Sequence, residues 1–305
     1  MDLNQYNFSI HITTKNRYKD LIFTLNKINY LLDRGDVEVI VFDDGSTDGT
    51  FEKVEKKFPL IKIHRNEFSK GYLYCRNKML NETKAKFAIS LDDDAHFITH
   101  DPLNKILKQF DEDKNCGLIA FRIFWGLEEP VEIISNEVPQ RVKGFVGCGH
   151  AWRMDAWRDI PDYPEWFEFY GEENFSAMHL FKKSWNIYYL PEVLVNHRVN
   201  IKSRKQNADY SIRLQRSLRS GWYLYFLFLP LKLIPRKMAY SVWMQLKLKV
   251  FKGDLKALKA LFLASFDLMI SISKIIKNKD RFSDCEFLEF QKLGETRIYW
   301  EPEKQ

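Results

Sequence analysis

Three consecutive acidic residues, Asp92, Asp93 and Asp94, follow the short apolar segment 87–91. A triple carboxylate directly after a buried strand is electrostatically costly, so we expect a cation to neutralise it. Alternate acids at a strand end converge on one ion, and hard carboxylate oxygens suit Mg²⁺ or Mn²⁺. The spacing therefore predicts a divalent metal site at Asp92 and Asp94.

A second acidic pair, Asp43 and Asp44, ends another apolar segment, 37–42, and leads into Gly-Ser-Thr-Asp-Gly-Thr at 45–50. Two carboxylate clusters at strand ends indicate one crevice at the edge of an open α/β sheet, where such folds bind ligands. The segment after Asp44 also fits a turn with helix capping. Both interpretations stay open from the residues alone.

The elements that must position these acids alternate between strand and helix over the first two hundred residues. Expected helices cover 18–34, 50–58 and 72–82, and a further helix opens at Gly171. Expected strands cover 8–13, 37–42, 61–64, 87–91, 117–124 and 185–190, the last ending at Pro191. This alternation predicts an α/β fold with a mainly parallel sheet flanked by helices.

Aromatic residues gather after the acidic triplet. A glycine-rich loop at 144–149 is able to approach a ligand closely. Aromatic-lined grooves bind sugars, but clustered rings more often serve ordinary core packing. The rings in question are Trp152, Trp157, Trp166, Phe167, Phe169 and Tyr170.

Length and composition set the class of the protein. The 305 residues are enough for one large domain, or for a medium domain with an appendage. Hydrophobic content of 45% and aromatic content of 15% exclude a disordered chain. The four cysteines lie far apart and form no metal or redox spacing, which favours a reduced, cytosolic setting. The first five residues do not resemble a signal peptide.

The net charge of +6 hides an asymmetry along the chain. Residues 198–281 contain 19 lysines and arginines against four acidic residues, a net of +15 that leaves −9 elsewhere. This division predicts an acidic, metal-using body and a basic appendage that faces an anionic surface. A basic face that only promotes solubility is the alternative.

The basic segment is helical in pattern. Its apolar run 222–231 is interrupted by Pro230 and is far shorter than the roughly 20 residues that span a bilayer. Two amphipathic stripes follow, beginning at Ala239 and Leu255, with lysines beside them. Such helices fit an interfacial membrane anchor, and they equally fit helices docked on the body.

Five short motifs occur in order along the chain: Ile-Thr-Thr-Lys-Asn-Arg at 12–17, Val-Phe-Asp-Asp-Gly-Ser-Thr-Asp at 41–48, Arg-Asn at 76–77, Leu-Asp-Asp-Asp at 91–94 and Gly-Glu-Glu at 171–173. Together they resemble the ordered signature of family 2 glycosyltransferases, inverting enzymes of the GT-A fold. The resemblance covers roughly residues 8–200. It implies a catalytic domain at 1–200, with a basic amphipathic helical region at 201–305.

The resemblance assigns roles to residues. In the metal site, Asp94 is the expected direct ligand, joined by Asp92 and by His197. Glu173 stands where the family usually has an aspartate base, and Glu172 beside it is the alternative. A carboxylate held in an aromatic pocket gains basicity by desolvation. The implied nucleotide-binding residues are Thr13, Thr14, Asn16, Arg17, Asp43, Asp44, Arg76, Asp92 and Asp93.

Within this set, Asp44 or Asp43 would accept a hydrogen bond from the nucleotide base. Arg76 would contact the diphosphate, although a solvated helix arginine is an equally good interpretation. His179 stands where an arginine is frequent in the family, a local departure that leaves the acids in place.

The resemblance implies an inverting enzyme that moves a hexose or related sugar from a nucleotide-diphosphate sugar to an acceptor hydroxyl, with Mn²⁺ or Mg²⁺ as cofactor. The expected acceptor is a glycan or a lipid-linked molecule in bacterial cell-surface polysaccharide synthesis. The expected location is cytoplasmic, peripheral at the inner face of the plasma membrane, with no nucleic-acid partner.

Two alternatives remain open. One is a sugar nucleotidyltransferase, whose N-terminal glycine-rich loop this chain lacks. The other is a non-catalytic carbohydrate- or membrane-binding protein with a degenerate transferase fold, against which the retained acids argue.

Overall fold

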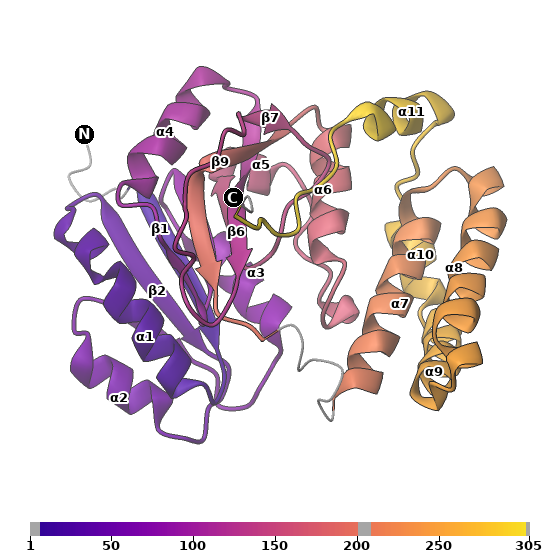
Figure 1. Ribbon diagram of the computed structural model, residues 1–305, viewed down its shortest axis with the longest axis horizontal. Helices are drawn as coiled ribbons and strands as arrows, with labels where there is room; N and C mark the ends of the chain where they lie inside the picture. Colours follow the sequence, from indigo (N-terminus) through magenta and orange to yellow (C-terminus); the bar gives the residue numbers. More distant parts are fainter. Residues whose placement is uncertain (1–6, 201–208, 303–305) are drawn as a thin grey trace.

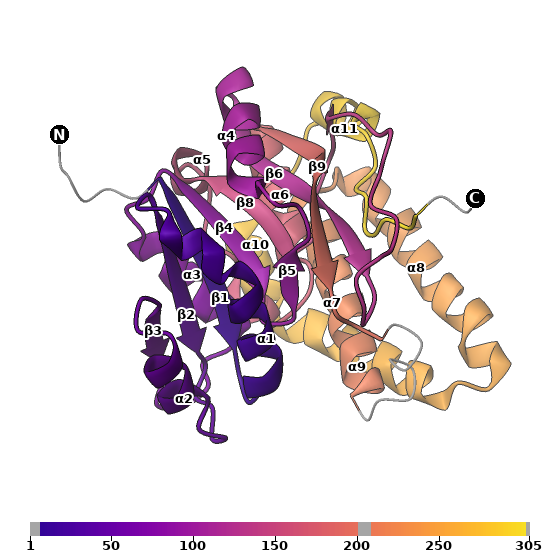
Figure 2. The same ribbon diagram turned by 60° about the vertical axis from the view of Figure 1, so that its left-hand side comes forward.

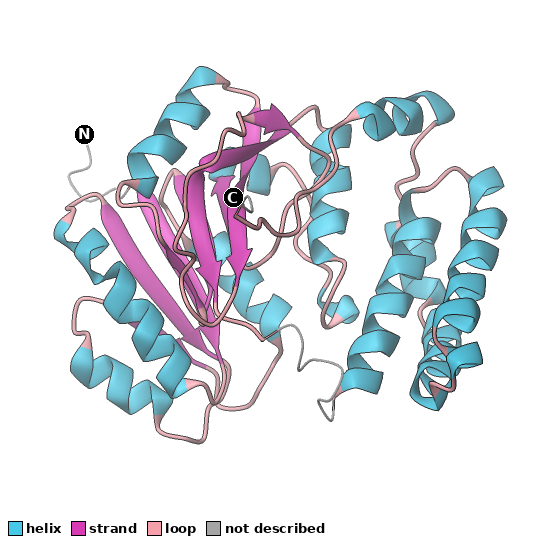
Figure 3. Ribbon diagram, viewed as in Figure 1, coloured by secondary structure: helices cyan, strands magenta, loops and turns pink. Residues whose placement is uncertain are grey.

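The computed structural model describes residues 7–200 and 209–302. A curved sheet with helices packed on it forms one side of the molecule, and a group of helices from the C-terminal part forms the other (Figure 1). Colouring by secondary structure shows that the strands are confined to the first side (Figure 3).

The sheet has nine strands, of which β1 to β4 are parallel to one another. The order is β3-β2-β1-β4-β8-β6-β9-β5, and β7 pairs with β9. Strand β8 is antiparallel to both β4 and β6. The predicted α/β fold with a largely parallel sheet is therefore confirmed. The strands are β1 (Phe8–Thr14), β2 (Val37–Asp43), β3 (Lys62–Arg65), β4 (Phe87–Asp92), β5 (Ala95–Phe97), β6 (Cys116–Trp125), β7 (Gln140–Arg141), β8 (Gly149–Arg153) and β9 (Asn186–His197).

The register of the central strands brings the acid-bearing ends together. Thr14 at the end of β1 pairs with Asp43 at the end of β2, and Thr13 pairs with Asp92 at the end of β4. Because parallel strands end at the same edge, both carboxylate clusters lie at that edge, as the sequence predicts.

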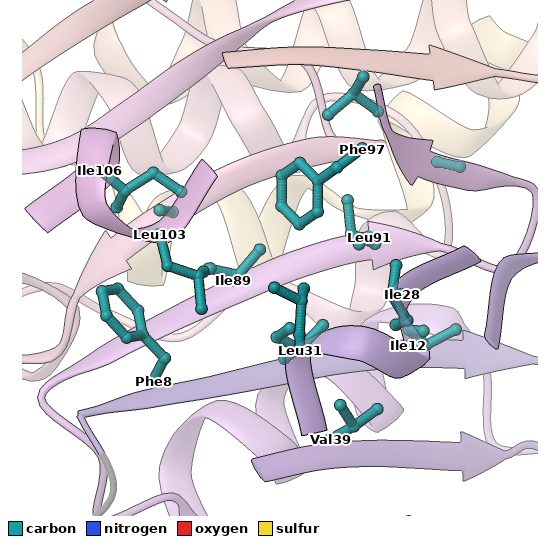
Figure 4. Close-up of a cluster of buried hydrophobic side chains, with 14 of the residues drawn as sticks. Phe8, Ile12, Ile28, Leu31, Val39, Ile89, Leu91, Phe97, Leu103 and Ile106 are labelled. Atoms are coloured by element: carbon teal, nitrogen blue, oxygen red, sulfur yellow. The ribbon is translucent and has the colours of Figure 1, made fainter. Parts of the chain in front are cut away.

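Six helices accompany these strands: α1 (Tyr18–Ile28), α2 (Thr50–Lys57), α3 (Tyr72–Glu82), α4 (Pro102–Glu112), α5 (Met154–Arg158) and α6 (Glu172–Lys182). The helix predicted at 18–34 is α-helical only to Ile28 and continues as a 3-10 turn over 29–33. Side chains of α1 and α4 pack on the sheet in one apolar cluster, with Ile28 and Ile106 beside Ile12 and Ile89 (Figure 4).

The predicted end of a strand at Pro191 was wrong. Strand β9 continues to His197, and its pairing with β6 shifts from Phe121–Leu190 to Arg122–Leu194. Pro191 lies in this irregularity, where a residue without a backbone N–H interrupts no regular ladder. The continuation carries His197 to the edge where β4 ends.

Five helices follow: α7 (Tyr210–Phe228), α8 (Ile234–Leu248), α9 (Leu255–Ile270), α10 (Ile272–Asn278) and α11 (Asp284–Lys292). Helix α7 lies between the sheet-containing part and helix α8 in both views (Figure 1 and Figure 2). Its Tyr223 and Phe228 are buried against Phe167 and Phe175, so most of the apolar run at 222–231 is docked on the body. None of the described helices is long and apolar enough to cross a membrane.

Candidate active site

A cleft of about 900 Å³ opens at the sheet edge where the acidic strand ends meet. The loops and ends after β1, β2, β4 and β9, together with the start of α6, supply its walls. The residues named from sequence that line it are Thr13, Thr14, Arg17, Asp44, Asp92, Asp93, Asp94, Glu172, Glu173 and His197. Segments more than 180 residues apart in the chain thus share one cavity.

Asp92, Asp94 and His197 form a cluster suited to a metal ion. One ligand atom of each lies within 4.8 Å of the others. His197 Nε2 is 3.0 Å from Asp94 Oδ1 and 3.8 Å from Asp92 Oδ2. Two carboxylates and an imidazole fit Mn²⁺ better than Mg²⁺, which prefers oxygen ligands alone.

Two cationic side chains neutralise these acids in the structure. Arg17 donates to Asp94 at 2.5 Å, and its Nε lies 3.0 Å from Asp93 Oδ1. Burial opposes the charge of His197, but Cys148 and Asp94 raise its pKa to about 11. Burial likewise opposes the charge of Asp94, yet His197 and Arg17 lower its pKa. A metal ion at this cluster would therefore have to displace a proton from His197.

Asp93 is held differently from its neighbours. Its carboxylate accepts a hydrogen bond from the Thr14 hydroxyl at 2.8 Å, and its carbonyl accepts one from Thr24 at 2.8 Å. Burial raises the pKa of Asp93 to about 7, against the opposing charge of Arg17. The residue thus links the end of β4 to β1 and α1.

Asp44 fixes the loop that leads into α3. Its oxygens accept from Asn66 Nδ2 at 2.8 Å, Ser69 Oγ at 2.6 Å and the backbone N–H groups of Lys70 and Gly71 at 2.8 and 3.0 Å. Burial opposes the charge, but these bonds lower the pKa of Asp44. Asp44 lines the cleft.

Asp43 lies one residue earlier and takes another position. It is fully buried and does not line the cleft, and its Oδ1 accepts from the backbone N–H of Ser46 at 2.8 Å. Of the two carboxylates proposed for base recognition, Asp44 is therefore the one that reaches the cavity.

Asn16 and Arg76 also lie outside the lining. The Asn16 side chain accepts from Thr47 N–H at 2.7 Å, which fastens the end of β1 to the loop after β2. Arg76 is 3% exposed and donates to Asp92 at 2.9 Å and to the Gly147 carbonyl at 2.8 Å. Burial opposes its charge, but Tyr72 and Asp92 raise its pKa. The structure shows Arg76 orienting Asp92, and a diphosphate contact stays a prediction.

Helix α6 begins with the two candidate bases. Gly171 has φ +87° at its N-cap, and a Cβ there would lie 3.0 Å from Ser220 Cβ. Only glycine therefore allows α6 and α7 to approach so closely. The positive end of the helix dipole favours a carboxylate in the first turn, where both glutamates lie.

The two glutamates differ in exposure. Glu172 is 3% exposed, and burial together with the charge of Glu173 raises its pKa well above the ordinary value. Glu173 is partly exposed to the cleft, and burial raises its pKa against the backbone at the helix start and Arg76. A Cβ on Gly147 would lie 2.7 Å from Glu173 Oε1, so the glycine-rich loop sets the position of this carboxylate.

Several lining residues escaped sequence analysis. The Tyr72 hydroxyl donates to Asp92 at 3.2 Å, and the Trp125 ring packs on His197 with centroids 5.3 Å apart. No motif marks either residue. Arg213 and Arg216 of α7 also line the cleft, although the sequence suggested an appendage there. Of the aromatic cluster, Trp152, Trp157 and Phe167 are core, whereas Phe169 and Tyr170 face the cavity.

Solved structures resemble this fold at low sequence identity. A mannosyltransferase from Pyrobaculum calidifontis, solved with GDP-Man and Mn²⁺, has a TM-score of 0.55 at 15% identity, covering 95% of this chain and 80% of its own. GalNAc-T7 with UDP, GalNAc and Mn²⁺ has a TM-score of 0.56 at 15% identity over 74% of this chain, which spans 49% of its length. Residues 1–349 of Staphylococcus aureus TarS give 0.54 at 18% identity, covering 86% and 81%.

These likenesses confirm the GT-A fold and the helical C-terminal region. No curated protein matches the chain by sequence. The model of the family described as "Glycosyl transferase family 2" matches residues 9–166, more than half of the chain and the part that carries the acidic clusters at 43–44 and 92–94. The chain belongs to glycosyl transferase family 2.

Proposed function

We propose that this chain is a metal-dependent, inverting glycosyltransferase that uses a nucleotide-diphosphate sugar as donor. One observation carries the proposal: a metal-type cluster and a carboxylate of raised pKa lie in the same cleft. Family membership supplies glycosyl transfer as the reaction class. The same proposal includes the division of the chain into a catalytic domain at 1–200 and a helical region at 201–305.

The donor would bind between the strand ends and α3. Thr13, Thr14 and Asp44 line that side of the cleft, with Asp44 the candidate partner of the nucleotide base. Asp92, Asp94 and His197 would hold Mn²⁺. When bound, the ion supplies positive charge that stabilises the departing diphosphate. The mannosyltransferase and GalNAc-T7 were solved with Mn²⁺ and a nucleotide or nucleotide sugar, which supports this assignment.

Glu173 would act on the acceptor. It removes the proton from an acceptor hydroxyl, whose oxygen bonds to the anomeric carbon while the bond from that carbon to the diphosphate oxygen breaks. Attack opposite to the departing group inverts the configuration. A pKa raised by burial makes Glu173 a stronger base. Its exposure to the cleft favours it over the more deeply buried Glu172.

A further part of the proposal concerns the acceptor. We assign transfer of a hexose or related sugar to a glycan or lipid-linked acceptor in bacterial cell-surface polysaccharide synthesis, at the inner face of the plasma membrane. The exposed aromatic and basic side chains of α9, such as Phe262, Phe266 and Lys256, support a membrane position. A sugar nucleotidyltransferase is disfavoured by the family match.

Donor hydrolysis tests the proposal. The parent should release free sugar from a nucleotide sugar only with Mn²⁺ present. Glu173→Gln should lower turnover by about 10²- to 10⁴-fold, because a general base contributes that much, with donor affinity nearly unchanged. Glu172→Gln is the matched control and should lose less. If Glu172→Gln is the inactive variant and Glu173→Gln retains turnover, the base moves by one position. If neither changes turnover, the mechanism is wrong.

A further inference from the structure

Helix α9 is apolar on two opposite sides. One side packs on α7 through Ala257, Ala260 and Ala264, all fully buried. The opposite side carries Phe262 and Phe266, which are 69% and 55% exposed. A surface helix normally has a polar outer face, and apolar character all round indicates a helix with a second partner.

The exposed rings continue onto the neighbouring helix. Trp243 of α8 is 51% exposed and lies 6.2 Å, centroid to centroid, from Phe251 in the turn before α9. Both helices lie on the side of the molecule away from the sheet (Figure 1). We name this surface the outer helical face. Its large apolar members are Trp243, Phe251, Leu255, Phe262, Phe266 and Met269.

The solvent-exposed charges of helices α8 to α10 are predominantly positive. Residues 234–278 contain nine lysines and arginines and only two acids, Asp254 and Asp267. Asp254 caps α9 and accepts from Tyr210, and Asp267 accepts from Gln215 and Arg219 of α7. Both carboxylates are therefore engaged within the fold, whereas Lys252, Lys256 and Lys259 are exposed beside the apolar residues.

We propose that the outer helical face docks the protein on an anionic lipid bilayer, with α8 and α9 lying in the plane of the headgroups. Exposed aromatic and aliphatic side chains flanked by lysines are what such an interface binds. A second copy of the chain is a poorer occupant because it would bring two basic faces together. Nucleic acid would leave the apolar side chains without a partner. The helices do not span the bilayer, since none that the structure describes is long and apolar enough.

Docking there would hold the cleft near the membrane. Helix α7 lines the cleft with Arg213 and Arg216, and α9 packs on the same helix. The lipid-bound enzyme would thus present its acceptor side to molecules anchored in the bilayer. This consequence rests on the proposed function, whereas the docking itself does not.

Vesicle co-sedimentation of the full chain tests the proposal. The parent should bind vesicles containing phosphatidylglycerol more tightly than vesicles of phosphatidylcholine alone, and salt should weaken that binding because charge is screened. Lys252→Gln, Lys256→Gln and Lys259→Gln together should weaken binding by about fivefold per lysine. The matched control changes Lys56, Lys86 and Lys108, exposed on the body, to Gln. It should bind like the parent.

A second variant, Phe262→Ser with Phe266→Ser, should remove the binding that persists at high salt. Circular dichroism and donor hydrolysis without vesicles should match the parent for every variant, which separates a failure of docking from a failure of catalysis. The proposal is overturned if the parent ignores anionic vesicles at low salt, or if the control loses binding equally. It is also overturned if sedimentation of the protein without vesicles shows a dimer that dissociates when Phe262 and Phe266 are changed to Ser.

Discussion

Helices α7 and α9 lie against each other and are both rich in large apolar residues, yet they bury different shares of them. In α7, Trp222 and Phe228 are essentially inaccessible, enclosed by the body on one side and by α8 and α9 on the other. In α9, only the side toward α7 is covered, and Phe262 stays exposed. The comparison teaches that the apolar content of a helix does not fix its role. Its role depends on how many of its sides other elements cover.

Removal of one ring from each helix should reveal this difference as unequal losses in the free energy of unfolding. Phe228→Ala should lower the free energy of unfolding by about 3–5 kcal/mol, since it opens a cavity in a closed core. Phe262→Ala should change it by no more than about 0.5 kcal/mol, because the ring is mostly in water. Urea denaturation of both variants measures the two values. Equal losses would mean that α9 is covered on its outer side in the protein alone.

The sheet-containing part of the molecule has a tight contact between Gly147 and Glu173, which should affect activity rather than stability. Gly147→Ala places a methyl group 2.7 Å from Glu173 Oε1, closer than the two atoms can approach, so the flexible carboxylate has to move. A misplacement of about 1 Å at a catalytic group costs about 10²-fold in rate. We expect turnover to fall by roughly that factor while the melting temperature stays near that of the parent.

The control for this change is Gly35→Ala, where nothing lies within 4 Å of an added Cβ. It should leave turnover unaltered. A Gly147→Ala variant as active as the parent would show that the loop does not position Glu173.

Two buried histidines, His11 on β1 and His179 on α6, should each oppose folding as the pH falls. Burial and the charge of Arg76 lower the pKa of His11 to about 3, and burial lowers that of His179, next to Phe228, to about 4. Between these values and about 6.5 the unfolded chain binds protons that the folded chain does not. The contribution of each histidine to stability is therefore complete above pH 6.5 and falls below it, by up to about 1.4 kcal/mol per pH unit.

Chemical denaturation at neutral pH and at about one or two units lower measures this loss. His11→Gln and His179→Gln should each reduce the slope against pH by one histidine's share. Variants whose slopes equal that of the parent would contradict the assignment of both histidines as neutral in the fold.

Much of the body could be predicted from sequence because its pattern is local. Apolar segments followed by acids mark parallel strands and their ends, so Asp92, Asp94 and Asp44 were expected in one crevice. The route of β9 past Pro191 could not be read, since it depends on a shift of register against β6.

The features that could not be predicted from sequence depend on long-range packing. The role of Gly147 depends on the position of Glu173, and the place of Arg213 depends on how α7 docks. Helical periodicity in α8 and α9 showed that apolar stripes exist, but not which of them other helices cover. Asn16 and Arg76 lie outside the lining of the cleft because they bond to distant loops, at Thr47 and Gly147, and Asp43 is buried with its Oδ1 on the backbone N–H of Ser46.

Calorimetric titration of nucleotide sugars into the parent and into Asp94→Asn, with and without Mn²⁺, tests the central claim most directly. Asn keeps the shape of Asp94 but removes the charge that the cluster with Asp92 and His197 offers to an ion. Asp155→Asn, an exposed acid on α5, serves as the control. We predict that the parent and the control bind a donor tightly only with Mn²⁺, and that Asp94→Asn loses this dependence. Donor binding by the parent that is equally tight without metal, or by Asp94→Asn that is equally strengthened by Mn²⁺, would contradict the account.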